Sequence, residues 1–167
     1  MSARRVVLVV AIVAAGAASC SRVARNEHPV CEARPATRLL AESVPTAAFV
    51  PCVRSLPVGW SFSGLDAVDG RGTFWLNSDD GGERALQASL VRTCRPEGTR
   101  TAPGSVPGRV RRYVDVRETS PYRAVWTDVF PGGCARYLLS FVAGARSDRL
   151  VGQLERGLSL IARDRLG

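Results

Sequence analysis

The strongest constraint on the fold is a series of short segments within residues 60–142 in which apolar and polar side chains alternate. Alternation with a period of two is typical of β-strands that bury one face. The segments are separated by turn-forming sequences such as Asp69-Gly70 and the Asp-Asp-Gly-Gly run at 79–82. The sequence therefore predicts two three-stranded antiparallel meanders, near residues 59–94 and 108–142.

Each predicted strand has one apolar face that we expect to point into the core. In the last strand this face is made of Ala135, Tyr137, Leu139 and Phe141. In the other strands the predicted inward residues are Trp60, Phe62 and Gly64, then Leu86, Ala88, Leu90 and Cys94, then Val110, Val114 and Val116.

Helical patterns flank the predicted strands. Pro35 suits the first turn of a short helix that ends before Pro45, and a buried connector without regular structure is expected after it. A C-terminal helix is predicted with Ser147 as its N-cap. Its apolar stripe is Leu150, Val151, Leu154, Leu158 and Ile161. The predicted fold is one α+β domain over 34–167, with an antiparallel β-meander sheet of about six strands, a short N-terminal helix and a C-terminal covering helix.

The N-terminus carries an export pattern. Two arginines precede an apolar run of 13 residues, Val6 to Ala18, which is too short to span a bilayer and predicts a signal peptide at 1–19. Small residues then lead to Cys20, which resembles the lipid-attachment cysteine of a bacterial lipoprotein. We expect Cys20 to carry the lipid and 20–33 to include the tether. Ordinary cleavage near Ala17, or an uncleaved anchor, remain open alternatives.

The cysteine count agrees with lipidation. There are five cysteines, and lipidation of Cys20 leaves four that can form two disulfides. Four cysteines allow three connectivities, and an exported protein favours disulfides over a zinc site. We predict the pairs Cys31–Cys52 and Cys94–Cys134, because each joins segments that the expected topology brings close. Each pair is expected to contribute about 3–4 kcal/mol through chain entropy.

The composition excludes several kinds of site. All 23 basic residues are arginines, so a P-loop or a Schiff-base lysine is impossible. The single histidine, His28, lies in the expected N-terminal tail, which leaves no Ser-His-Asp site in the core. The formal charge is +8, but the arginines are scattered and form no basic helix, so we expect no nucleic-acid partner.

Two groups of residues are candidate binding sites. Five carboxylates, of Asp66, Asp69, Asp79, Asp80 and Glu83, cluster around two predicted turns and would form a calcium site if the turns met. Asp79 and Asp80 are the candidate ligands, although Asp-Gly pairs are common turn chemistry and we expect no metal or other cofactor. The three tryptophans, Trp60, Trp75 and Trp126, either stack on a ligand or fill the core, and we expect the core.

Three stretches, VPCVRSLPVGW, FWLNSDDGG and FPGGCARY, together resemble a group of actinobacterial exported proteins. The resemblance implies export and no particular activity. Our hypothesis is a non-enzymatic cell-envelope lipoprotein, or a membrane-tethered exported domain, on the outer face of the cytoplasmic membrane. Its partners would be the membrane, through Cys20 or an N-terminal anchor, and an envelope molecule. The alternative is a secreted hydrolase that uses carboxylates or a metal.

Overall fold

The computed structural model describes residues 27–101 and 109–167. The elements, in chain order, are α2 (Pro35–Ser43), β1 (Phe49–Val53), β2 (Trp60–Val68), β3 (Arg71–Ser78), β4 (Gly82–Val91), β5 (Thr99–Thr101), β6 (Arg111–Thr119), β7 (Tyr122–Phe130), β8 (Gly133–Ser140), α3 (Ser147–Gly157), β9 (Leu158–Ala162) and the 3₁₀ turn η1 (Arg163–Leu166).

The main sheet is antiparallel and has seven strands in the order β2-β3-β4-β8-β7-β6-β5. The α+β class is confirmed, but the predicted count of about six strands is too low. The two predicted meanders are β2-β3-β4 and β6-β7-β8, and they join edge to edge where β4 pairs with β8. The seventh strand, β5, lies in a Pro/Gly-rich stretch without apolar periodicity, and pairing with β6 alone defines it.

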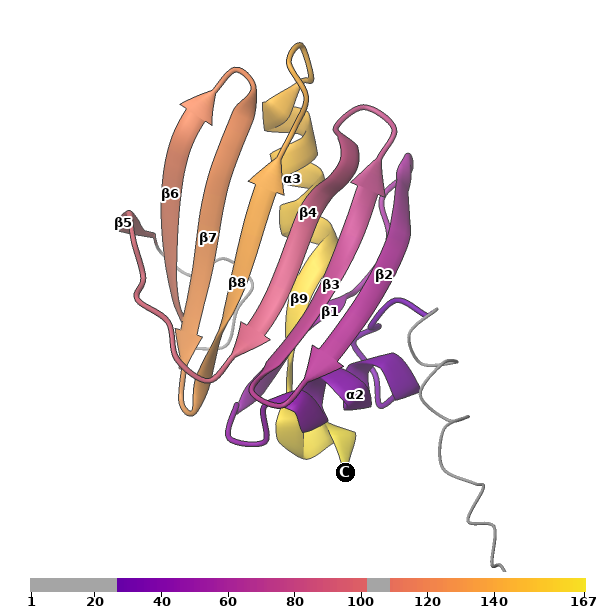
Figure 1. Cartoon of the computed structure of the whole chain (residues 1–167), viewed down its shortest axis with the longest axis vertical. Helices are drawn as coiled ribbons and strands as arrows, with labels where there is room; N and C mark the ends of the chain where they lie inside the picture. Colours follow the sequence, from indigo (N-terminus) through magenta and orange to yellow (C-terminus); the bar gives the residue numbers. More distant parts are fainter. Residues whose placement is uncertain (1–26, 102–108) are drawn as a thin grey trace, which may run out of the picture.

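One face of the sheet is covered and forms the core. In Figure 1 this face points away from the viewer, with α3, β9 and β1 behind it. The predicted inward residues of β8 and the residue after it are all buried there: Ala135, Tyr137, Leu139 and Phe141. The neighbouring strands β3 and β4 also contribute buried apolar residues to the core: Phe74, Leu76, Leu86, Ala88 and Leu90.

Three predicted inward positions need correction. In β2 a bulge between Phe62 and Gly64 shifts the alternation, so that Leu65, not Gly64, returns to the core. Val116 is 48% exposed beside a second bulge in β6, near the edge of the sheet. Cys94 lies beyond the end of β4 at Val91, so the alternation of the strand does not determine which face of the sheet its side chain lies on.

The second layer contains two strands that the sequence analysis missed. β1 and β9 form an antiparallel ladder, and all five residues of β1 are buried. The connector after the first helix is therefore a strand, although it contains Pro51. Pairing with a distant segment, Leu158–Ala162, stabilises it, and a local pattern does not reveal such pairing.

The C-terminal helix is shorter than predicted. α3 begins at Ser147, which is its first residue and not its N-cap, because Arg146 holds the cap position. It ends at Gly157, so Leu158 and Ile161 of the predicted helical stripe belong to β9. A Cβ on Gly157 would lie 2.9 Å from the carbonyl oxygen of Ser55. The close approach of the β1–β2 connection explains both the glycine and the end of the helix.

The N-terminal helix packs on the sheet as expected. Pro35 occupies its first turn, and Leu40 and Val44 are fully buried. A Cβ on Gly72 of β3 would lie 2.7 Å from Leu40 Cδ2 and 2.6 Å from Ser43 Oγ. Glycine at this position is what allows α2 to approach the sheet so closely.

The chain joins the domain earlier than residue 34. Val30, within the expected tether, forms a parallel bridge with Val53 of β1, and the Val53 amide donates to the Pro29 carbonyl. The Thr37 hydroxyl also donates to the Val30 carbonyl at 2.5 Å. Residues 29–31 are therefore held against the second layer.

Candidate functional site

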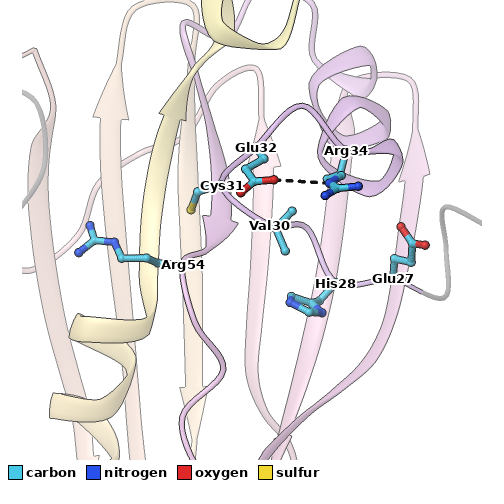
Figure 2. A pocket seen from close by; sticks show the side chains of 7 residues that line it. All are labelled: Glu27, His28, Val30, Cys31, Glu32, Arg34 and Arg54. Carbon is cyan, nitrogen blue, oxygen red and sulfur yellow. Dashed lines mark hydrogen bonds and ion pairs between the residues drawn. The ribbon is translucent and has the colours of Figure 1, made fainter.

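A pocket of about 670 Å³ lies where the N-terminal segment meets the domain. Figure 2 shows that its polar side chains do not converge: Glu32 and Arg34 face each other, His28 and Glu27 point elsewhere, and Arg54 lies apart. Glu32 and Arg34 form an ion pair at 3.4 Å, and the His28 ring packs 6.3 Å from Phe62. This arrangement of the described residues offers no nucleophile–base pair.

The carboxylates considered as a calcium site are not brought together. Successive hairpin turns lie at opposite ends of the strand they share, and the eight residues of β3 separate the two turns by about 26 Å. Asp69, in the first turn, pairs with Arg92, while Asp80, in the second, lies 3.8 Å from Arg149. Asp79 and Asp80 are therefore turn residues. Within residues 27–101 and 109–167, no three acidic, His or Cys side chains gather as metal ligands would.

The four cysteines of the described chain form two disulfides, Cys31–Cys52 and Cys94–Cys134, with Cα atoms 5.0 and 6.4 Å apart. These are the two pairs predicted from the sequence. The first holds the N-terminal segment to β1, and the second joins the end of one meander to the other. Cys20 lies outside the described residues.

The open face of the main sheet faces the viewer in Figure 1. The strand registers place a continuous row of polar residues on it. Strand register places them side by side in the order Asp66, Thr73, Ser89, Arg136, Thr127, Tyr113 and Arg100. Thr73 and Ser89 share a hydrogen bond of 3.0 Å. Arg136 is exposed at the centre of this row.

Trp75 lies on the same open face, unlike the other two tryptophans. Trp60 and Trp126 are buried, as expected for core residues, whereas Trp75 is half-buried. Its indole nitrogen donates to Gln87 Oε1 at 3.0 Å, and the Arg84 guanidinium stands 5.3 Å above its ring. The indole, the amide and the guanidinium hold one another in place.

A hollow of about 380 Å³ lies over β4 on this face. Arg71 and Arg136 line it from the strands on either side, Gln87 and Ser89 lie on β4 itself, and Arg95 belongs to the segment after β4. That segment crosses the ends of β8 and β7 to reach β5 (Figure 1). The Cys94–Cys134 disulfide fixes its first part to the sheet.

A second hollow, about 370 Å³, lies beside the first, and Leu138 lines both. Arg117, Glu118 and Arg123 supply its charged groups. The Arg117 guanidinium binds Asp115 at 2.9 Å and Glu97 at 2.6 Å. The hydrogen bond to Asp115 is the main cause that raises the pKa of Arg117, against partial desolvation.

Several arginines of the open face form no ion pair, although Asp66 lies on the same face. Every aspartate and glutamate of the chain belongs to the described residues, because 1–26 and 102–108 contain none. The ion pairs formed there use other arginines and leave Arg71, Arg95, Arg100, Arg111 and Arg136 without a carboxylate partner. The face therefore offers several free guanidinium groups above a floor of hydroxyl and amide groups.

A separate ionic cluster lies on the covered face. Arg112 of β6 binds Asp128 of β7 through two hydrogen bonds of 2.6 Å. Asp128 is fully buried, and the side chain of Arg112 is 16% exposed. The Arg112 guanidinium also lies 5.4 Å from the Trp126 ring. Since its charges are paired and buried, this cluster belongs to the packing of the domain.

Sequence reasoning did not single out Arg71, Gln87, Ser89 or Arg136. A signal was present, because these polar residues alternate with the buried apolar ones along their strands. The sequence did not show that β4 pairs with β8, and this pairing brings β3, β4 and β8 together.

No protein-family model, curated protein or solved structure matches the chain. No helix in the described part of the chain is long and apolar enough to cross a membrane.

Proposed function

We propose that this protein is an exported, non-enzymatic binding protein of the cell envelope, and that it binds an anionic envelope partner with the open face of its sheet. The observation that carries the proposal is the group of arginines without carboxylate partners around the hollow over β4. Guanidinium groups bind carboxylate and phosphate oxygens with paired, charge-assisted hydrogen bonds.

The two disulfides support export, because such bonds persist in oxidising compartments. The short apolar run before Cys20 supports a signal peptide. We further propose that Cys20 is lipidated and holds the domain on the outer face of the cytoplasmic membrane.

The attachment of the N-terminal segment is favourable for this function. The segment joins the domain at β1, in the layer behind the sheet. A tether that starts there leaves the opposite, open face free to meet a partner.

The binding surface is tested with the full chain and two polymers, anionic polygalacturonate and neutral dextran, at several salt concentrations. We expect binding to polygalacturonate only, weakening as salt screens the charges. The double variant Arg71→Gln with Arg136→Gln should bind about tenfold more weakly. The matched control, Arg146→Gln with Arg156→Gln, removes the same charge beside and within α3 and should bind as the parent does. Equal losses in both variants would show that net charge, and no particular face, causes the binding.

The anchor is tested separately by cell fractionation and mass spectrometry of the N-terminal peptide. Cys20→Ala should release the protein from membranes and leave it folded. An unmodified terminus at Ala18 would instead show ordinary secretion, and a retained Arg4-Arg5 segment in the membrane fraction would show an uncleaved anchor.

A further inference from the structure

We infer that the hollow over β4 is a binding site for one unit of an acidic saccharide, whose acid group lies between Arg71 and Arg136. This inference rests on the proposed function and deepens it by naming the ligand class. The acid group is a carboxylate or a phosphate, since both present oxygens that a guanidinium group recognises.

The position of the arginines supports one shared anion. Arg71 on β3 and Arg136 on β8 flank β4 but are offset by two residues along the strands, so their Cα atoms are about 12 Å apart across the sheet. Both line the same hollow, together with Arg95 from the segment above. Arginine side chains are long enough to reach a group held between the two strands.

The charge balance of the hollow selects an anion. Glu97 is the only acidic residue among the described residues that line it, and Glu97 already binds Arg117 at 2.6 Å. Arg71, Arg95 and Arg136 therefore face the hollow without a carboxylate of their own. A neutral or cationic ligand would leave these charges uncompensated.

The uncharged polar side chains of the hollow can form hydrogen bonds with the hydroxyl groups of a sugar. Gln87 and Ser89 lie on the floor, and the Gln87 amide is oriented by Trp75 at 3.0 Å and contacts Ser89 Oγ at 3.5 Å. Such neutral donors and acceptors match the hydroxyl groups of a sugar. The volume, about 380 Å³, lies within the range found for small-ligand sites and accommodates one sugar unit.

The Cys94–Cys134 disulfide keeps the site open in one shape. It joins Cys94, in the segment that carries Arg95, to Cys134 on the strand that carries Arg136. The disulfide therefore links the two backbone segments that carry two of the three arginines.

Calorimetric titration of the full chain tests the inference with four probes: D-glucuronate, D-glucose 1-phosphate, D-glucose and inorganic phosphate. We expect at least one acidic sugar to bind in the millimolar range or tighter, about tenfold better than glucose or phosphate. If glucuronate binds more strongly, the acid group is a carboxylate. If glucose 1-phosphate binds more strongly, it is a phosphate.

Variants locate the site. Arg71→Gln and Arg136→Gln should each weaken binding of the acidic sugar about tenfold, and Gln87→Leu should weaken it by less. Arg123→Gln, which removes a charge from the second hollow, is the control and should leave binding unchanged. Circular dichroism melting curves check that each variant is folded.

Four outcomes would overturn the inference. If glucose binds with the same affinity as the acidic sugars, the acid group is not recognised. If inorganic phosphate binds with the same affinity as the acidic sugars, the sugar is not recognised. An equal loss in Arg123→Gln would place the site elsewhere. If no small probe binds while polygalacturonate still binds the open face, this inference fails and the proposed function stands.

Discussion

At the scale of single residues, Asp128 is the most demanding position in the core. Its carboxylate is fully buried, and Arg112 donates both of the side-chain hydrogen bonds that it accepts in the described structure. Burial lowers the pKa of Arg112, but the hydrogen bond and the charge of Asp128 outweigh burial and raise it. Removing one charge of such a pair leaves the other desolvated and uncompensated.

Asp128→Asn should therefore lower the free energy of unfolding by about 3–5 kcal/mol, measured by denaturant titration. The control is Asp69→Asn, which breaks the exposed pair with Arg92 and should change stability by no more than about 1 kcal/mol. Asp128→Leu combined with Arg112→Met should recover most of the loss. A small effect of Asp128→Asn alone would contradict the importance of the pair.

Replacing the hydroxyl of Tyr137 should not destabilise the protein at neutral pH, in contrast to the replacement of Asp128. Its hydroxyl is buried without a hydrogen-bond partner in the described structure, and burial strongly raises its pKa. A raised pKa in the folded state contributes stability that is fully present below the unfolded value, about pH 10, and is lost as the pH rises above it.

Tyr137→Phe should leave stability at pH 7 unchanged or raise it by about 1 kcal/mol, because an unsatisfied hydroxyl is removed. Above pH 10 the parent should lose about 1.4 kcal/mol more per pH unit than the variant. Denaturant titrations at several alkaline pH values measure both effects. Parallel pH profiles would show that this hydroxyl ionises as readily in the folded protein as in the unfolded chain.

At the scale of elements, the change from α3 to β9 shows what a local pattern cannot decide. The spacing of Leu150, Leu154 and Leu158 fits one helix, yet the chain turns to a strand at Leu158. The deciding contacts come from the β1–β2 connection at Ser55 and from pairing with β1, both about 100 residues earlier in the sequence. The strands of the two meanders were predictable because alternation is a local signal. β1, β5 and β9 were not, since long-range pairing defines them.

The same reasoning applies to the candidate site. The Cys94–Cys134 pair followed from the expected meanders and the Cys31–Cys52 pair from the helix that these cysteines flank. The arginine site required the pairing of β4 with β8 as well. The carboxylate hypothesis failed because neighbours in sequence, the turns around β3, lie at opposite ends of one strand.

Two glycines of α3 test the account of this helix. Gly152→Ala should raise stability by about 1 kcal/mol, because its Cβ would meet only Arg156, at 3.4 Å, and alanine favours a helix. Gly157→Ala should lower stability, because its Cβ would press on the Ser55 carbonyl. Thermal or denaturant unfolding measures both changes. Stabilisation by Gly157→Ala would mean that packing does not end the helix.

At the scale of the whole molecule, two meanders form one sheet, whose covered face forms the core and whose open face is the surface that we propose for binding. The Cys94–Cys134 disulfide connects the meanders beside the arginine site, whereas Cys31–Cys52 lies at the N-terminal attachment. The two links close loops of 40 and 21 residues and should contribute similarly, about 3–4 kcal/mol each.

Replacing both cysteines of a pair with serine should therefore separate stability from binding. Either double variant should unfold more easily by a similar amount. Under conditions where both remain folded, Cys94→Ser with Cys134→Ser should weaken polygalacturonate binding, and Cys31→Ser with Cys52→Ser should leave it unchanged. Equal binding by the two variants would show that the segment carrying Arg95 needs no covalent fixing.

The most direct test of the open face as the binding surface is a two-dimensional NMR titration of the isotope-labelled chain with polygalacturonate. The account predicts that the amide signals that shift most belong to the open-face strands β3, β4 and β8, around Arg71, Ser89 and Arg136. Shifts concentrated in α2, α3, β1 and β9, with the open face unaffected, would contradict it.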